Sequence, residues 1–306
     1  ACHHYWMFHD QEFPRFPGRN SPEFKKHRGF LLEVYERIDS SIGRLMAHTG
    51  PNVGVLLVSD HGSGGAGNGV IYLNRWLSSE NLLTFKTPRF RDRTLDYIKR
   101  SGLRWVPRGL KQNLFRQHKV LAGNIESRIR FSAIDFSNTF AFSEEMNSNP
   151  SIWINLKGRD PEGAVPPADY EALREKIIHS AESLRDPRTG EKLFNRAHKR
   201  EELYQGPYID RFADIILEPA LEGKDSSTSY PPENGYSYSF LVSGNLKTSK
   251  TSDNPWFREL SDTEQMGARG RSMNGTHRPN GFFVMAGPGI QSNTVKLSAD
   301  LTDFAP

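Results

Sequence analysis

Apolar residues recur at helical spacing in the first fifty residues of this chain and then form a continuous run. Ser21-Pro22-Glu23 is typical of a helix start, with a capping Ser, Pro at the first helical position and an acid in the first turn. The apolar positions that follow lie three or four residues apart, at Leu31, Val34, Ile38, Ile42 and Leu45. Residues 53–58 are apolar at nearly every position, which predicts a strand buried on both faces of a parallel sheet. The two segments together predict an α/β unit.

The later part of the chain predicts one more regular helix and several short strands. Between Tyr170 and Leu184, apolar residues again follow the helical period. Strands are expected at 152–155, 213–217, 240–242 and 281–286, the last of them buried, and segments rich in Ser, Gly, Pro and Asn predict loops at 222–236 and 245–256. No internal repeat is visible.

Residues 72–133 have a different pattern, which is helical, basic and interrupted by Pro88 and Pro107. We interpret this segment as an insertion between two parts of a catalytic core, 1–71 and 134–306. From Lys86 to Arg130 there are thirteen Lys or Arg and three acidic residues, about +10 in a chain whose formal charge is +4. Such a block could contact phosphate-bearing substrates, nucleic acid or an anionic surface. A solvated helical insertion is the alternative.

Composition narrows the class of protein. The 306 residues are 36% hydrophobic and 25% charged, which predicts a soluble globular chain, and no apolar stretch approaches the roughly 20 residues that span a bilayer. The lone Cys2 excludes an intrachain disulfide and weakly favours a reducing compartment. The chain opens without Met and ends at 301–306 where a helix should start, so we interpret it as part of a longer protein.

The candidate chemistry begins directly after the apolar run. Asp60 and His61 offer a hard oxygen and an imidazole nitrogen, both suited to a divalent metal ion, at the end of the predicted strand. Residues 62–67 have almost no side-chain bulk and predict a loop that a ligand could approach closely. The alternative is a capping Asp with a hydrogen-bonded His in a turn.

Two more histidines complete a pattern. His277 lies in Gly275-Thr276-His277-Arg278-Pro279, before a predicted strand, and His3 opens the chain, followed by Tyr5-Trp6 and Asp10-Gln11-Glu12-Phe13-Pro14. With Val58-Ser59-Asp60-His61-Gly62, these motifs resemble the type I phosphodiesterase/nucleotide pyrophosphatase branch of the alkaline phosphatase superfamily. Segments similar to that family extend over nearly the whole chain outside the insertion: 35–45, 73–77, 154–163, 202–207 and 301–306.

The resemblance implies a fold and a metal site. The fold would be an alkaline-phosphatase-like, doubly wound and mostly parallel α/β sheet with helices on both faces. Two divalent ions, usually Zn²⁺ with Mn²⁺ possible, would be bound in the site. Asp60 and His61 would hold the ion that activates the nucleophile, and His3 and His277 the ion that activates water. The Thr or Ser nucleophile, and an Asp four residues before the first His, would fall upstream of Ala1.

Three basic residues are weaker candidates for contact with the substrate phosphate. Arg278 follows His277, whereas Lys157 and Arg159 follow the predicted strand at 152–155. Structural ion pairing is the alternative for each of them.

The expected function is therefore that of a metal-dependent phosphoric ester hydrolase, most simply a phosphodiesterase or nucleotide pyrophosphatase that forms a phosphoryl intermediate on Thr or Ser. Divalent ions would neutralise the anionic ester before attack. Two alternatives remain open. One is another phosphatase or a sulfatase of the same superfamily, and the other is a non-catalytic protein that binds anions or nucleic acid on a degenerate hydrolase scaffold. The substrate and the oligomeric state cannot be read from the residues.

Overall fold

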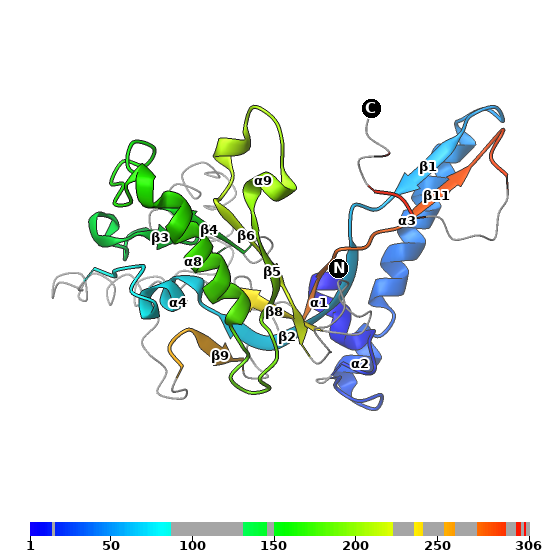
Figure 1. The fold of residues 1–306 in the computed structure, drawn as a ribbon. Helices are drawn as coiled ribbons and strands as arrows, with labels where there is room; N and C mark the ends of the chain where they lie inside the picture. The colour runs from blue at the N-terminus through cyan, green and yellow to red at the C-terminus, as the bar shows by residue number, and fades with distance from the viewer. Residues whose placement is uncertain are drawn as a thin grey trace, which may run out of the picture.

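The computed structural model describes residues 1–13, 16–86, 131–145, 150–222, 236–240, 254–260, 274–291, 298–300 and 303. Figure 1 shows helices and strands distributed along the whole of this part of the chain. The α-helices are α1 (Cys2–Tyr5), α2 (Pro22–His27), α3 (Phe30–Ala47), α4 (Leu73–Ser79), α8 (Tyr170–Ser183) and α9 (Arg200–Leu203). Short 3-10 turns occupy Trp6–Phe8, Phe136–Asn138, Pro167–Asp169 and Ile209–Arg211.

The described strands form three separate sheets. Their bounds are β1 (Val55–Val58), β2 (Gly62–Ile71), β3 (Ala141–Phe142), β4 (Ser151–Ile154), β5 (Phe194–Lys199), β6 (Ile215–Pro219), β7 (Leu221–Glu222), β8 (Tyr236–Phe240), β9 (Phe257–Glu259), β10 (Gly275–Arg278) and β11 (Phe283–Ala286). One sheet pairs β1 with β11, another has the order β3-β4-β6-β5, and the third runs β10-β2-β8-β7 with β9 also on β2.

The structure confirms a mixture of helices and strands but not a doubly wound parallel sheet. Among the described strand pairs, only β2 and β8 run parallel, while the β3-β4-β6-β5 sheet is antiparallel throughout. A doubly wound sheet needs a helical crossover between parallel neighbours. Here α8 instead lies between β4 and β5, two strands that both flank β6 in the antiparallel sheet.

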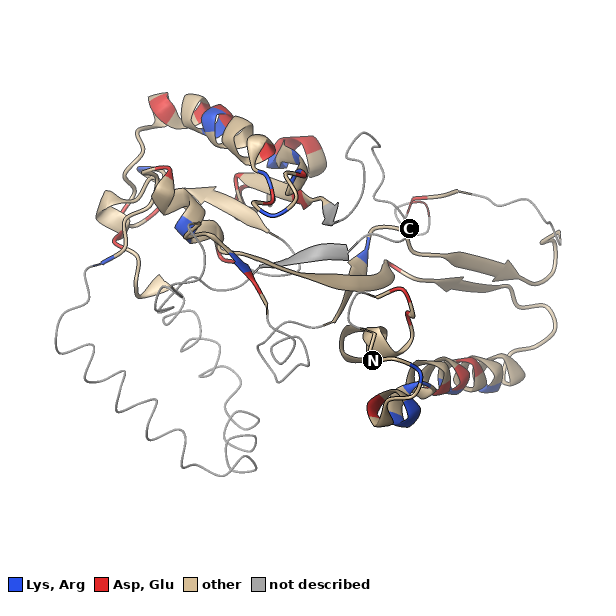
Figure 2. Cartoon of the chain, turned by 90° about the horizontal axis from the view of Figure 1, so that it is seen from below, with Lys and Arg blue, Asp and Glu red and all other residues tan. Residues whose placement is uncertain are grey.

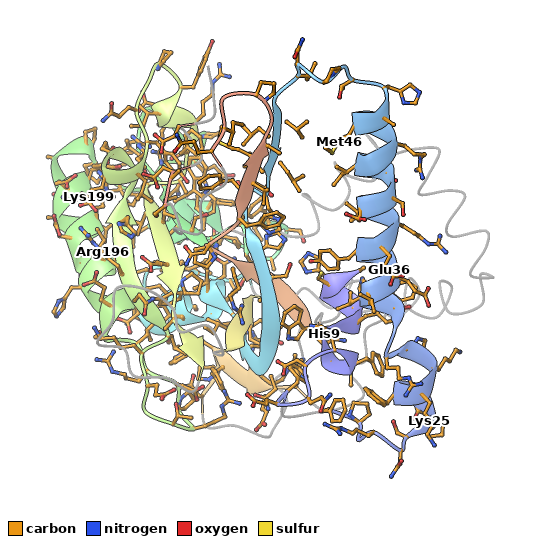
Figure 3. All side chains as sticks on the ribbon, turned by 90° about the vertical axis from the view of Figure 1, so that its right-hand side faces the viewer. His9, Lys25, Glu36, Met46, Arg196 and Lys199 are labelled. Atoms are coloured by element: carbon orange, nitrogen blue, oxygen red, sulfur yellow. The ribbon has the colours of Figure 1, made fainter. Side chains whose placement is uncertain are left out.

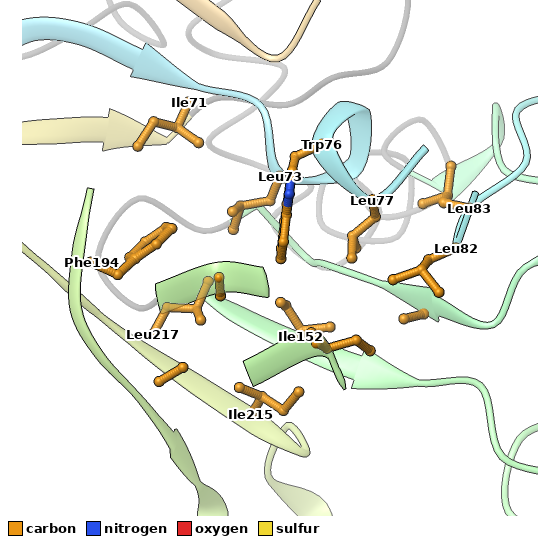
Figure 4. Packing of buried hydrophobic residues seen from close by; sticks show 14 of the residues in the cluster. Ile71, Leu73, Trp76, Leu77, Leu82, Leu83, Ile152, Phe194, Ile215 and Leu217 are labelled. Carbon is orange, nitrogen blue, oxygen red and sulfur yellow. The ribbon is translucent and has the colours of Figure 1, made fainter. Parts of the chain in front are cut away.

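The main hydrophobic core lies between the antiparallel sheet and two helices. We call these elements together, α4, α8 and β3 to β6, the core body. Figure 4 shows Trp76, Phe194 and Ile152 among the buried side chains of this core. The apolar face of α8 contributes Ile177 and Ala181, both fully buried, as the helical period at 170–184 predicts. The strands predicted near 152–155 and 213–217 are confirmed as β4 and β6.

A buried carboxylate ties the core body together. The fully buried side chain of Asp214 accepts hydrogen bonds from the guanidinium groups of Arg159 (2.7 Å) and Arg200 (3.0 Å), the Tyr170 hydroxyl (2.7 Å) and the amide of Ile154 (2.7 Å). Burial alone would lower the pKa of Arg159, but the hydrogen bonds and charges of Asp214 and Asp160 together outweigh it and raise that pKa. Burial and the Asp214 carboxylate raise the pKa of Tyr170 well above its ordinary value.

We call helix α3 and the β1–β11 pair together the arm, because neither contributes a residue to the main hydrophobic core as the structure describes it. The cap predicted at Ser21 is confirmed, because its hydroxyl accepts from the Phe24 amide (3.1 Å), but α2 ends before Gly29 and α3 carries the apolar stripe. Figure 2 shows no charged residue on β1 or β11, and Figure 3 shows α3 beside them, on the other side of the molecule from Arg196 and Lys199 of β5.

Residues 53–58 and 281–286 were predicted to be buried strands, and the prediction is right about the strands but wrong about their burial. Both strands form, but Leu56 and Val284 are exposed, and so is Leu45 on α3, with 71% of its surface accessible. Within the part of the chain that the structure describes, β1 pairs only with the antiparallel β11. One neighbouring strand cannot cover both faces of a strand whose side chains alternate from face to face.

The glycine-rich stretch after His61 is a strand and not the predicted loop. Residues 62–71 form β2, which pairs with β10 along its first half and with β8 and β9 along its second half. The absence of side chains therefore allows protein segments to approach closely instead of a ligand, as the contacts at Gly64 described below show.

The predicted insertion is described only at its edges. Residues 72–86, which include α4, pack within the core body, whereas all of the basic segment after Lys86 lies outside the described residues. The boundaries 1–71, 72–133 and 134–306 thus stay a prediction. Residues 241–242, and most of the predicted loops at 222–236 and 245–256, also fall outside the description. None of the described helices is long and apolar enough to cross a lipid bilayer.

Candidate metal centre

Three segments distant in sequence bring His3, His61 and His277 together. His3 lies on α1, His61 lies between β1 and β2, and His277 lies on β10. Strand β10 pairs antiparallel with the start of β2, so His277 is opposite Ser63, two residues after His61. Helix α1 packs against β10 in turn. Figure 1 shows α1 beside β2, where the arm meets the rest of the molecule.

Asn274 joins α1 to the start of β10. Its buried side chain accepts a hydrogen bond from the amide of Met7 (3.2 Å) and donates one to the carbonyl of His4 (2.9 Å). The next residue, Gly275, lies so close to α1 that an added Cβ would overlap the carbonyl oxygen of Cys2. A side chain at position 275 would therefore push His3 and His277 apart.

His3 and His277 face one another through their Nε2 atoms, which are 3.1 Å apart. The Nδ1 of His3 lies 3.0 Å from the carbonyl oxygen of Gly275. Since a carbonyl only accepts, Nδ1 carries the proton in this contact, and the Nε2 of neutral His3 keeps its lone pair toward His277. A backbone carbonyl that fixes the tautomer in this way is a common partner of a metal-binding histidine.

His61 is held in a similar way. Its Nδ1 lies 2.8 Å from the carbonyl oxygen of Gly62, and its ring stacks on His277 with the centroids 4.0 Å apart. The Nε2 atom lies 3.7 Å from a carboxylate oxygen of the largely exposed Asp60. Both orienting carbonyls, at Gly62 and Gly275, belong to the β2–β10 pair, so this pair sets the direction of two of the three rings.

The pKa of His277 is lowered. Burial is the first cause, the positive charges that His61 and His3 would carry add to it, and Asp60 opposes it. A lower pKa keeps the imidazole neutral, which is the form that binds metal ions.

The donor set fits a transition-metal ion in its chemistry but is not arranged as a finished site. Three imidazoles and one carboxylate are ligands that Zn²⁺ and Mn²⁺ accept. In the described part of the chain, however, no three His, Cys, Asp or Glu side chains are placed to hold an ion as they stand. Stacked rings point their lone pairs side by side, so the His61 ring must turn before it can share an ion with its neighbours.

The weaker candidates for contact with the substrate phosphate lie in two different parts of the structure. Arg159 follows β4, in a different sheet from His277, and its guanidinium binds Asp214, Asp160 and the carbonyl of Ile154. Lys157 is exposed in the same loop. Arg278 is next to His277 in sequence but donates to main-chain carbonyls. Asn274 and Gly275 were not among the residues that the motifs predicted, because only the fold shows that α1 approaches β10.

The sequence model of the family described as Type I phosphodiesterase / nucleotide pyrophosphatase matches residues 1–238. The chain therefore belongs to this family, as its motifs predicted, and membership suggests a hydrolase of the phosphodiesterase or pyrophosphatase kind. Neither a curated protein nor a solved structure matches the chain. The match includes the positions of His3, Asp60 and His61 and ends before His277, whose ring the structure places next to those of His3 and His61.

Proposed function

We propose that this chain provides metal ligands of a metal-dependent phosphoric ester hydrolase that cleaves phosphodiesters or nucleotide pyrophosphates. His3, Asp60, His61 and His277 would hold two divalent ions, Zn²⁺ or Mn²⁺. One observation carries the proposal. The Nε2 atoms of His3 and His277, which are far apart in sequence, meet at 3.1 Å, while a main-chain carbonyl fixes the tautomer of His3.

Bound ions would neutralise the charge of the phosphate ester and lower the pKa of an attacking hydroxyl or water. The residues of this chain hold the ligands ready for that task. The carbonyls of Gly275 and Gly62 orient His3 and His61, and the lowered pKa of His277 favours its neutral form. Asp60 adds the only negative charge of the four and lies next to the stacked rings. None of these residues is the nucleophile, which the family resemblance assigns to a Thr or Ser.

Calorimetric titration of the chain with ZnCl₂ and MnCl₂ tests the proposal directly. We expect His3→Ala and His277→Ala to abolish or strongly weaken binding, and His179→Ala, at an exposed position of α8, to leave it unchanged. Equal binding by all variants, or no binding by the folded wild-type chain, would reject the site.

Hydrolysis of bis-p-nitrophenyl phosphate separates the enzyme from the non-catalytic alternative. It is expected only from protein that also carries the Thr or Ser nucleophile. Zinc-dependent release of nitrophenol by such protein supports the hydrolase. Steeply salt-dependent binding of an anion, without turnover, would instead favour the degenerate scaffold.

A further inference from the structure

The side chain of Arg278, which follows His277 in sequence, contacts main-chain atoms of β2 and β10. Its guanidinium donates from Nη2 to the carbonyl of Gly65 (2.8 Å) and from Nη1 to the carbonyl of His277 (3.2 Å). Both acceptors are main-chain atoms, one on β2 and one on β10. The side chain therefore links the two strands that orient the histidines.

The register of the strands places Arg278 on the other face from His277. In the β10–β2 pair, Arg278 is opposite Gly62 and His277 is opposite Ser63. Successive side chains of a strand point to opposite faces. The imidazole of His277 therefore lies on the face of His3 and His61, and the Arg278 side chain leaves β10 on the reverse face.

Gly64 provides the space for this guanidinium. A Cβ at position 64 would overlap the guanidinium carbon and the Nε of Arg278, and a Cβ at position 62 would lie 3.2 Å from the Arg278 Cβ. Glycines at these positions let the arginine lie flat across β2 and reach Gly65. The glycine-rich stretch after His61 is thus matched to one side chain of this chain.

We propose that Arg278 is a positioning residue for His277: by clamping β10 onto β2, it sets where the His277 imidazole meets His3 and His61. This inference rests on the proposed metal site and replaces direct contact between Arg278 and a substrate phosphate. Partners that orient metal ligands indirectly typically change metal affinity about 10-fold to 100-fold when removed. We expect a change of that size for Arg278.

The test uses Arg278→Met, which keeps an apolar stem without donors, with Arg37→Met on the exposed surface of α3 as the matched control. We expect Arg278→Met to weaken zinc binding about 10-fold to 100-fold and to speed amide hydrogen exchange in β10 and at Ala66, whose amide binds the Asn274 carbonyl. Arg278→Lys, which retains one donor group, should be intermediate. The control should change neither zinc affinity nor exchange.

Gly64→Ala should also break the contact of Arg278 with β2, but without removing the arginine. It should displace the guanidinium and reproduce the effects of Arg278→Met, whereas the double variant Gly64→Ala/Arg278→Met should be no worse than Arg278→Met alone. Additive effects in the double variant would contradict the clamp. In protein that also carries the nucleophile, a higher KM for bis-p-nitrophenyl phosphate caused by Arg278→Met, with zinc affinity and exchange unchanged, would assign Arg278 to substrate binding and overturn the proposal.

The two readouts separate failure of this inference from failure of the proposed function. If the wild-type chain binds no zinc, the proposed function fails, but faster exchange at β10 in Arg278→Met would still establish the clamp. If zinc binds and Arg278→Met leaves exchange in β10 unchanged, the clamp is rejected while the metal site stands.

Discussion

The core body and the arm are built from similar sequence patterns but differ in how completely the chain covers them. Helix α8 and strand β6 bury their apolar residues against α4 and the antiparallel sheet, where Ile177 and Ile215 are fully buried. Helix α3 and strand β1 have an equally regular apolar pattern, yet Leu45 and Leu56 remain exposed. An apolar pattern thus predicts that a helix or strand has an apolar face, but it does not predict which segment buries that face.

The histidine cluster lies where these two units meet. His61 links the arm strand β1 to β2, and β2 continues into Ile71 and α4 of the main core. The site is therefore anchored on one side by tightly packed structure and on the other by a unit with little burial.

Removing the buried carboxylate should produce the largest loss of stability. Asp214→Ala leaves Arg159 and Arg200 without their shared partner inside the core body, and breaking a buried ion pair from one side costs about 3–5 kcal/mol. Chemical denaturation would measure this loss. Asp210→Ala is the matched control, because Asp210 pairs with Arg200 while largely exposed, and it should cost at most about 1 kcal/mol. Equal costs would show that the Asp214 cluster does not stabilise the core.

The same truncation in the two units gives the most direct comparison. Ile154→Ala removes a fully buried side chain from β4 and should lower the free energy of unfolding by about 2–5 kcal/mol. Leu45→Ala removes an exposed side chain from α3 and should change it by about 0.5 kcal/mol or less. A cost for Leu45→Ala close to that for Ile154→Ala would mean that another surface covers α3 in solution.

The sequence predicted the elements of both units better than their surroundings. The helices near 31–45 and 170–184, and the strands near 152–155 and 213–217, follow from local periodicity and are present. Burial of β1 and β11 was wrong, because it depends on strand partners that local periodicity does not encode. The glycine-rich stretch 62–67 was assigned to a loop for a related reason: its strand conformation depends on pairing with β10, more than 200 residues later.

The candidate site shows the same division. Residue types and motifs predicted His3, Asp60, His61 and His277, and the structure brings the three histidines into contact. The residues that hold them in place could not be predicted. Asn274 and Gly275 act through the approach of α1 to β10, and Arg278 acts through the register of β10 on β2. Each of these contacts joins segments that are distant in sequence.

Gly275→Ala tests whether the contact between α1 and β10 stabilises this junction. The new methyl would overlap the Cys2 carbonyl, so we expect a loss of about 1–3 kcal/mol together with weaker zinc binding. Gly43→Ala on α3 is the control, because an added Cβ there meets no atom within 4 Å. It should stabilise the protein by up to about 1 kcal/mol, since Ala favours a helix over Gly, and it should leave zinc binding unchanged. Thermal unfolding and zinc titration measure both changes. Unaltered zinc affinity in Gly275→Ala would show that the contact of α1 with β10 does not contribute to the proposed metal site.

The smallest effect is expected from the ion pair that joins α8 to β5. The carboxylate of Glu171 accepts a hydrogen bond from Lys199, which lowers the pKa of Glu171 below its ordinary value of 4.5. The ionised form is therefore favoured in the folded state, so this contribution to stability is fully present above about pH 4.5 and is lost as the pH falls through the lowered pKa. The difference in Tm between wild type and Glu171→Gln should thus be present at pH 7 and shrink below pH 4.5. It should be small because Glu171 is half-exposed, and it should shrink further in a Lys199→Met background, where the donor is gone. If the difference depended on neither pH nor Lys199, the ion pair would not stabilise α8, and the apolar packing of Ile177 and Ala181 would account for its position. Helices α8 and α3 would then differ only in how far their apolar residues are buried.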